Sequence, residues 1–319
     1  MTAILGGLAA AFMWAGANLL SSRSARLIGE DSTLGWMMLV GLIVAAPMAV
    51  ASGPMPEITV ATAAWLVGSG LGSVVGLAFL YRGLRIGKVG VVTALASTEG
   101  GIAAVVSVVR GESLSLPALI MLAVIAVGIV AVAFASGPAV AAPEGLGAIA
   151  ETGPDGATTT GGIGPGGTLS AAAADQAAAK HLEGRAVLFG TAAALCFGLA
   201  IYSTGQAGQV VPPFVAVLPA RIAGVVGVLI PLALMGRLRL SRRAVPMVIG
   251  IGLGEVLGNA AYVLGARESL AIAAVLASQY AAVAAIAAWF VFHERLSVGQ
   301  RVGIVTIAVG IAVLTAVRG

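Results

Sequence analysis

Long apolar runs recur along the chain, separated by short segments that carry most of the charged residues. Roughly 20 mostly apolar residues cross a bilayer as a helix. A transmembrane β-barrel would show shorter strands in which apolar and polar side chains alternate, whereas these runs are apolar on all sides. The pattern therefore predicts ten transmembrane helices, at residues 2–21, 33–52, 60–81, 89–109, 115–136, 185–204, 212–235, 244–265, 270–292 and 297–317.

The second half of the chain repeats the first half. The glycine-rich segment Gly68–Gly76 returns as Gly250–Gly258, 182 residues later. At the same offset, Ile125–Ile129 returns letter for letter as Ile307–Ile311. Internal repeats decide the architecture of a chain. We therefore predict an all-α integral membrane protein with two five-helix repeats, at residues 1–136 and 185–319, joined by a linker at 137–184.

An odd number of spans in each repeat has a geometric consequence. The second copy enters the membrane from the opposite side, so the two repeats are expected to be inverted relative to each other. Inverted repeats are typical of secondary transporters, in which two similar halves rock around a site near the middle of the membrane.

The predicted linker differs in composition from the rest of the chain. It is rich in Gly, Ala, Pro and Thr and has too few bulky apolar residues to form a core. We expect a flexible tether, whose alanine-rich end at Ser170–Glu183 continues as a helix into the sixth span.

Composition excludes a soluble globular protein. The chain is 59% hydrophobic and 9% charged, with a mean hydropathy of +1.06, against about 45–50% apolar and about 25% charged in soluble domains. We predict a multi-pass protein of the cell (plasma or inner) membrane. Because Cys196 is the one cysteine, an intramolecular disulfide and a multi-cysteine metal site are excluded, and no metal or cofactor is predicted.

The formal charge of +4 comes mostly from arginines in loops. Such residues orient membrane helices, so no nucleic-acid partner is predicted. Most of these arginines follow the first, third, fifth, seventh and ninth spans. The positive-inside rule would then place both termini outside the cytoplasm.

Three short motifs support a family resemblance: Trp14-Ala-Gly-Ala-Asn18, Gly111-Glu-Ser-Leu-Ser115 and His293-Glu-Arg-Leu-Ser297. With the two five-helix repeats, they make the chain resemble the EamA-type transporters of the drug/metabolite transporter superfamily, over nearly its whole length apart from the linker. The resemblance implies export or exchange of amino acids, other small metabolites or toxic compounds. Related proteins move nucleotide sugars or lipid-linked sugars. Members of the family usually keep both termini in the cytoplasm, which opposes the arginine bias.

Ionisable residues within the spans are the strongest candidates for function. A charged side chain at the centre of a transmembrane helix costs about 2.5–3.5 kcal/mol on insertion scales. Glu255 lies at the centre of the eighth span, Glu99 at the centre of the fourth, and Arg221 within the seventh. Glu112 and Glu294 fall at span ends instead, where we expect hydrogen bonds or ion pairs.

Polar side chains near these residues suggest a binding cavity. On the eighth span they are spaced i, i+4 and i+7, which places them on one helix face, and the first and ninth spans add further polar and aromatic side chains. The alternative is interhelical hydrogen bonding, worth about 0.6 kcal/mol per bond. The predicted substrate-binding residues are Trp14, Asn18, Glu99, Arg221, Glu255, Asn259, Tyr262, Gln279 and Tyr280.

Two hypotheses remain open for Glu255. Burial disfavours the charged form of a carboxyl group, which makes Glu255 the candidate proton-coupling residue. If Arg221 lies close, Glu255 instead stays charged as half of a structural or gating pair, or Arg221 binds an anionic substrate. Distances between helices decide between these hypotheses.

The predicted function is secondary transport of a small-molecule substrate by alternating access, with protons as the candidate coupling ion. The sequence has no G-x-x-x-x-G-K-[ST] motif for ATP and no His-Glu-x-x-His motif for an intramembrane hydrolase, so we do not predict an enzyme. A flippase for lipid-linked or nucleotide sugars is the nearest alternative, and a membrane scaffold is another. A monomer or homodimer is expected, because each chain contains both repeats.

Overall fold

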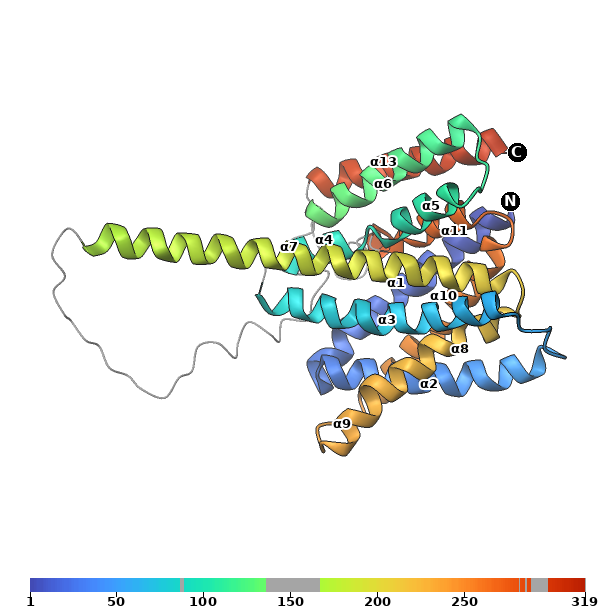
Figure 1. Ribbon diagram of the computed structural model, residues 1–319, viewed down its shortest axis with the longest axis horizontal. Coiled ribbons are helices and arrows are strands. Elements are labelled where there is room, and N and C mark those ends of the chain that lie inside the picture. The colour runs from blue at the N-terminus through green and yellow to red at the C-terminus, as the bar shows by residue number, and fades with distance from the viewer. Residues whose placement is uncertain (87–88, 136–166, 281, 285, 288–297, 319) are drawn as a thin grey trace.

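The computed structural model describes residues 1–86, 89–135, 167–280, 282–284, 286–287 and 298–318. In these ranges the chain is all-helical (Figure 1). The first half contains α1 (Thr2–Ile28), α2 (Glu30–Ala51), α3 (Val60–Ile86), α4 (Val89–Ala96), α5 (Glu99–Val109) and α6 (Leu116–Ala135). The second half contains α7 (Gly167–Gly208), α8 (Pro213–Gly224), the π-helical turn η1 (Val225–Leu229), α9 (Ile230–Leu234), α10 (Val245–Ala266), α11 (Leu270–Ala277) and α13 (Val298–Arg318).

The helices have the length and apolarity that a membrane requires. Six of the described helices are long and apolar enough to cross a bilayer: α1, α2, α3, the part of α7 from Gly184, α8 to α9, and α10. Shorter apolar helices lie in the remaining four predicted spans, at Glu99–Val109, Leu116–Gly128, Leu270–Ala277 and Arg301–Leu314. The predicted all-α membrane architecture is confirmed.

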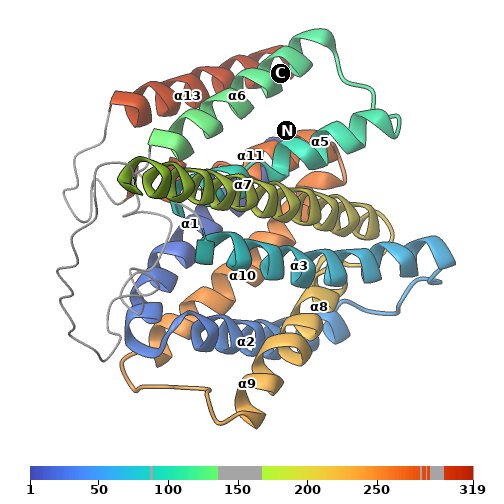
Figure 2. The same ribbon diagram turned by 60° about the vertical axis from the view of Figure 1, so that its left-hand side comes forward.

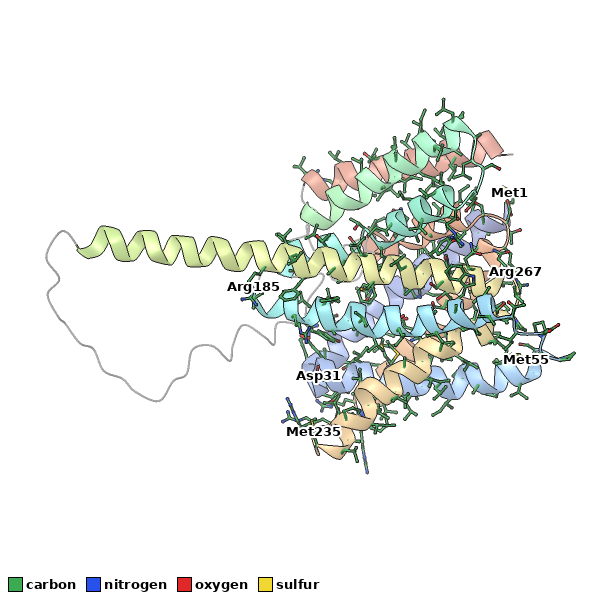
Figure 3. The ribbon with its side chains drawn as sticks, viewed as in Figure 1. Met1, Asp31, Met55, Arg185, Met235 and Arg267 are labelled. Carbon is green, nitrogen blue, oxygen red and sulfur yellow. The ribbon has the colours of Figure 1, made fainter. Side chains whose placement is uncertain are left out.

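The two halves run in opposite directions through the bundle. Met1, Met55 and Arg267 lie at one end, and Asp31, Arg185 and Met235 lie at the other end (Figure 3). Helix α1 therefore runs opposite to its repeat counterpart α7, and α2 runs opposite to α8. The repeats are inverted, as the odd number of spans predicts.

Helix packing follows the repeat symmetry. Helix α1 packs against α10, and the equivalent pair, α7 and α3, packs in the same way. The counterparts α2 and α8 pack against each other, as do α6 and α13. The pair α6 and α13 lies at one edge of the bundle, with α2 and α9 at the opposite edge (Figures 1 and 2).

Glycines allow the closest of these approaches. A Cβ atom added at Gly72 of α3 would lie 2.9 Å from the Cys196 carbonyl oxygen of α7. At the repeat-equivalent position, a Cβ on Gly254 of α10 would lie 3.0 Å from the Met13 carbonyl oxygen of α1. Small residues let membrane helices approach backbone to backbone, so the repeated glycine stripe accounts for the repeated packing.

Several predicted elements differ from the structure. The fourth and ninth spans are not continuous helices, because each is interrupted by a turn, at residues 97–98 and 278–279. The seventh span contains the π-helical turn η1, which precedes Pro231. Proline lacks an N–H and its ring clashes with the carbonyl four residues earlier, so the helix widens there.

The alanine-rich end of the predicted linker is helical and continues into the sixth span, as expected. Helix α7 begins at Gly167 and continues without interruption to Gly208, because the alanine-rich segment before Gly184 has a high helix propensity. In Figure 1 the first part of α7 extends beyond the ends of the other helices. Residues 136–166, in the remainder of the predicted linker, lie outside the described ranges.

The described arginines are distributed unevenly between the two ends. The end that carries Asp31 and Arg185 also holds Arg23, Arg26, Arg82 and the loop arginines 237, 239, 242 and 243. This loop is tied to α2, because Trp36 Nε1 donates to the Arg239 carbonyl at 2.9 Å. The uneven distribution of arginines along the sequence therefore gives the bundle one basic end.

Candidate functional site

Two helix breaks face each other in the middle of the bundle. The break between α4 and α5 follows Leu95-Ala-Ser97, and the break after α11 follows the repeat-equivalent Leu276-Ala-Ser278. Helix α5 packs against α11. A Cβ atom added at Gly100 would overlap the Ser278 hydroxyl and the Ala274 carbonyl oxygen. Irregular backbone at membrane depth is tolerated where it is buried in protein or lines a cavity, so these breaks mark the centre of the protein.

An ion pair joins α8 to α10. Arg221 Nη2 donates to Glu255 Oε2 at 3.2 Å. The arginine side chain is 4% exposed and the glutamate side chain 23%. A glycine makes room for the pair, since a Cβ atom on Gly41 of α2 would lie 2.9 Å from Arg221 Cδ. The contact favours the ion-pair hypothesis for Glu255 over the hypothesis that Glu255 alone is the proton site.

Electrostatic interaction links Glu99 to Glu255, and Glu99 begins α5, the helix that packs against α11. Tyr280, which follows the break in the ninth span, interacts in the same way with both carboxyl groups. A second acidic side chain, Glu99, therefore interacts with the Arg221–Glu255 pair through Glu255. The group holds one negative charge in excess when both acids are ionised, which favours binding of a proton or of a cationic group.

Aromatic side chains border this charged cluster. The rings of Trp14 and Tyr280 meet edge to face, with centroids 6.2 Å apart and planes at 80°. Gly258 of α10 leaves space for the indole, because a Cβ atom there would lie 2.7 Å from Trp14 Cδ1 and Nε1. Five predicted site residues are thus brought together: Trp14, Glu99, Arg221, Glu255 and Tyr280.

Some of the predicted site residues have buried polar atoms that make no hydrogen bond. Within the described part of the chain, the buried side-chain nitrogen and oxygen atoms without a hydrogen-bond partner are Trp14 Nε1, Arg221 Nε and Gln279 Oε1. All three belong to predicted site residues. Buried polar atoms are nearly always paired, and exceptions call for an explanation such as a missing ligand or water. Two free donors and one free acceptor suit a small polar ligand.

The other predicted site residues make local or structural contacts. Asn259 Nδ2 donates to the Glu255 carbonyl at 2.7 Å, one turn earlier on α10. The Tyr262 hydroxyl is directed to α7 and donates to the Ile201 carbonyl at 2.9 Å. Asn18 is exposed on α1. For Tyr262 the structure supplies the interhelical bond that the sequence left as an alternative.

Two glycines that shape the site were not predicted from the sequence. Gly41 lies against Arg221, and Gly100 lies where the two breaks meet. Gly41 gave no signal, because nothing in the sequence shows which helix it contacts. For Gly100 a signal existed in the repeated Leu-Ala-Ser, since identical residues at equivalent positions can encode identical breaks.

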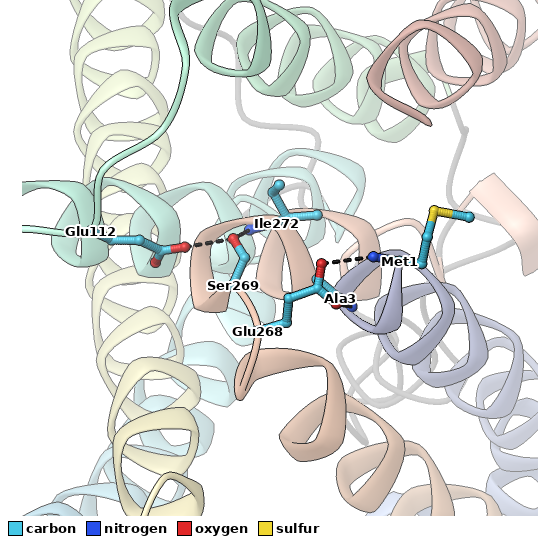
Figure 4. Close-up of polar contacts among 6 residues, drawn as sticks. All are labelled: Met1, Ala3, Glu112, Glu268, Ser269 and Ile272. Carbon is cyan, nitrogen blue, oxygen red and sulfur yellow. Dashed lines mark hydrogen bonds and ion pairs between the residues drawn. The ribbon is translucent and has the colours of Figure 1, made fainter. Parts of the chain in front are cut away.

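A polar clamp closes the end of the bundle that carries the N-terminus (Figure 4). Glu112 accepts hydrogen bonds from Ser107 Oγ, from Ser269 Oγ at 2.5 Å and from the Ala271 backbone N–H at 3.0 Å. Ser269 also caps α11 by accepting from the Ile272 N–H at 3.4 Å. A carboxylate is stabilised at a helix N-terminus by the free N–H groups and the helix dipole. Glu112 thereby fastens the first repeat to α11 of the second.

The prediction that Glu112 bonds at a helix end is confirmed, and Glu294 lies outside the described residues.

The backbone before Glu112 has a left-handed conformation, because Gly111 has φ +104°, a value that favours glycine. Beside the clamp, Glu268 binds the Met1 amino group at 2.7 Å and the Ala3 N–H at 3.2 Å. The hydrogen bond from that amino group lowers the pKa of Glu268 to about 2.

Replacing Glu112 by glutamine is expected to lower the free energy of unfolding by about 2 kcal/mol, the range for hydrogen bonds to charged groups. The amide keeps one acceptor oxygen and loses both the charge and the second acceptor. Denaturant unfolding in mixed micelles measures the effect. Glu57→Gln, an exposed acid in the loop between α2 and α3, is the matched control and should unfold like the wild type. Equal stability of the two variants would contradict the clamp.

Comparison with known proteins agrees with this fold. The sequence model of the EamA-like transporter family matches residues 1–134 and 184–316. A solved structure, described only as the crystal structure of a protein, is similar with a TM-score of 0.73 at 14% identity, over 99% of this chain and 97% of that chain. At this identity the likeness concerns the fold. No curated protein sequence matches the chain significantly.

Proposed function

Because the chain belongs to the EamA-like transporter family, we propose that it is a secondary transporter for a small polar metabolite, such as an amino acid-like or drug-like compound. Its substrate site is the cluster of Trp14, Glu99, Arg221, Glu255 and Tyr280. The observation that carries the proposal is that two members of the cluster, Trp14 and Arg221, have buried nitrogen atoms without a hydrogen-bond partner among the described residues. A multi-pass protein of the plasma (inner) membrane that works as a monomer or homodimer fits this function.

Alternating access has a physical basis in the inverted repeats. The site lies between the halves, beside two helix breaks at equivalent positions. Discontinuous helices near the membrane centre are a recurrent feature of transporter sites. The Glu112 clamp holds the N-terminal end closed, so opening toward that side requires these hydrogen bonds to break. Rocking of one half against the other would move the site from one face to the other.

We assign proton coupling to the acidic pair, with Glu99 as the group that binds the proton. Arg221 is paired with Glu255, so its positive charge is already engaged by one carboxyl group. Glu99 interacts with this carboxyl group, and like charges disfavour ionisation. A proton on Glu99 would relieve the repulsion between the two carboxyl groups. The proton would be released when rocking of the halves changes the exposure of Glu99.

Uptake into proteoliposomes tests the proposal. Labelled amino acids and cationic drugs are offered with and without an imposed proton gradient, to wild type, Glu99→Gln and Glu255→Gln. We expect the gradient to drive uptake by the wild type, and we expect Glu99→Gln to keep counterflow exchange while losing the response to the gradient. If Glu255→Gln loses that response and Glu99→Gln keeps it, the proton site is Glu255. If the wild type moves no compound of the panel, small-solute transport is contradicted and lipid-linked sugars become the next substrates to test.

A further inference from the structure

An apolar groove of about 660 Å³ runs along α5, between α6 and α7. It begins at Thr98, in the break between α4 and α5, and reaches Val109 at the end of α5. Helix α6 contributes Leu119 and Leu122 from the opposite side. The groove is distinct from the polar site, since none of the five clustered site residues lines it.

The chemistry of the groove is that of a hydrocarbon site. Aliphatic side chains and glycine form its walls apart from Thr98, whose hydroxyl donates to the Leu95 carbonyl at 2.7 Å. Apolar cavities of this kind hold no ordered water, because water there would lack hydrogen-bond partners. The groove is therefore suited to an apolar occupant.

The rim of the groove is continuous with the surface that faces the bilayer. Val105, Val109 and Leu195 on the rim are 64%, 79% and 50% exposed. The floor is formed by side chains that are nearly inaccessible, among them Ala104, Leu122 and Val275. Since α5 and α6 are apolar helices of the predicted fourth and fifth spans, the exposed rim faces the hydrocarbon layer.

We propose that this groove is a lipid site that receives one acyl chain of a bilayer phospholipid. The bilayer is the established environment of these helices, and acyl chains are the flexible apolar molecules that surround the open rim. Lipid tails are as apolar as leucine, so binding depends on how well a chain fills the groove and packs against its floor. A chain seated there ends beside Thr98, the residue before Glu99 at the helix break.

Photo-crosslinking tests the lipid site without reference to transport. The whole protein is reconstituted with phosphatidylglycerol that carries a diazirine in one acyl chain, and crosslinked residues are mapped by mass spectrometry. Lipid on the outer surface reaches Val105 and Val109, whereas the buried floor is reached only from inside the groove. We expect crosslinks on the floor residues Ala104, Leu122 and Val275 in the wild type.

Glycine substitutions give a matched comparison. A Cβ atom on Gly101 meets no atom within 4 Å, and Gly101 lines the groove, so the side chain of Gly101→Leu begins in open space and occupies part of the groove. Gly16 of α1 has equally open space around it and does not line the groove, so Gly16→Leu is the control. We expect crosslinking of the floor to fall severalfold in Gly101→Leu and to stay at the wild-type level in Gly16→Leu.

Ala123→Phe, which fills the groove from α6, should reproduce the loss and carries the test if Gly101→Leu fails to fold. Floor crosslinks that persist at the wild-type level in the folded plugging variants would overturn the proposal. Crosslinks confined to the exposed rim in the wild type would overturn it as well, because the chains would then lie only on the outer surface.

Discussion

Replacing Arg221 by methionine is expected to destabilise the protein by about 3–5 kcal/mol, the cost of removing one partner from a buried ion pair. The guanidinium group lies 3.2 Å from the Glu255 carboxylate, and the arginine side chain is 4% exposed. Methionine is similar in length and apolar, so the main change is the loss of the positive charge. Glu255 would then remain beside Glu99 with no cation in this contact, which adds repulsion to the desolvation cost.

A double-mutant cycle separates this charge effect from lost packing. Stability is measured by denaturant unfolding in mixed micelles for Arg221→Met, Glu255→Gln and the double variant. We expect the double variant to recover a large part of the loss, because it leaves no unpaired charge. Arg242→Met, in the exposed loop before α10, is the control and should change stability little. A double variant as unstable as the sum of the two single variants would show that the pair contributes nothing.

Replacing Gly100 by alanine is expected to cost about 3 kcal/mol, at the upper end of the range for overpacking. The added methyl group would overlap the Ser278 hydroxyl and the Ala274 carbonyl oxygen. The carbonyl belongs to the backbone of α11 and cannot rotate away, so α5 and α11 must separate. Because these helices carry the two breaks at the centre of the protein, we also expect transport to be lost.

The next residue along the chain supplies the control. Gly101→Ala places its methyl group in open space, and alanine is favoured over glycine in a helix by about 1 kcal/mol. The two substitutions are chemically identical and lie on the same helix, so they should change stability in opposite directions. Thermal unfolding in detergent and proteoliposome uptake measure both variants. Equal behaviour would mean that α5 and α11 do not meet closely at Gly100.

Much of the architecture followed from the sequence, because membrane helices satisfy their backbone hydrogen bonds internally and so appear as uninterrupted apolar runs. The repeat of Gly68–Gly76 as Gly250–Gly258 predicted the two halves, and five spans per half predicted their inversion. Ionisable residues in the spans pointed to Glu99, Arg221 and Glu255, because an acid or base in a membrane helix is rarely retained without a role.

The tertiary structure decided what depends on contacts between helices. Sequence spacing placed Glu255, Asn259 and Tyr262 on one face, yet the Tyr262 hydroxyl bonds to α7 while Glu255 meets Arg221 of α8. A helix face is wide enough to touch two neighbours, and periodicity along one helix does not identify them.

The breaks at Ser97 and Ser278 were not predicted, because Leu-Ala-Ser contains neither proline nor glycine, although its repetition in the two halves is visible in the sequence. By itself the sequence determined which segments enter the membrane and that the two repeats are inverted relative to each other. It also determined which side chains cost free energy to bury in the membrane, since all of these depend on local composition and order. Only the tertiary structure decided which of those side chains meet, because the Arg221–Glu255 pair and the close approach at Gly100 join residues from different helices.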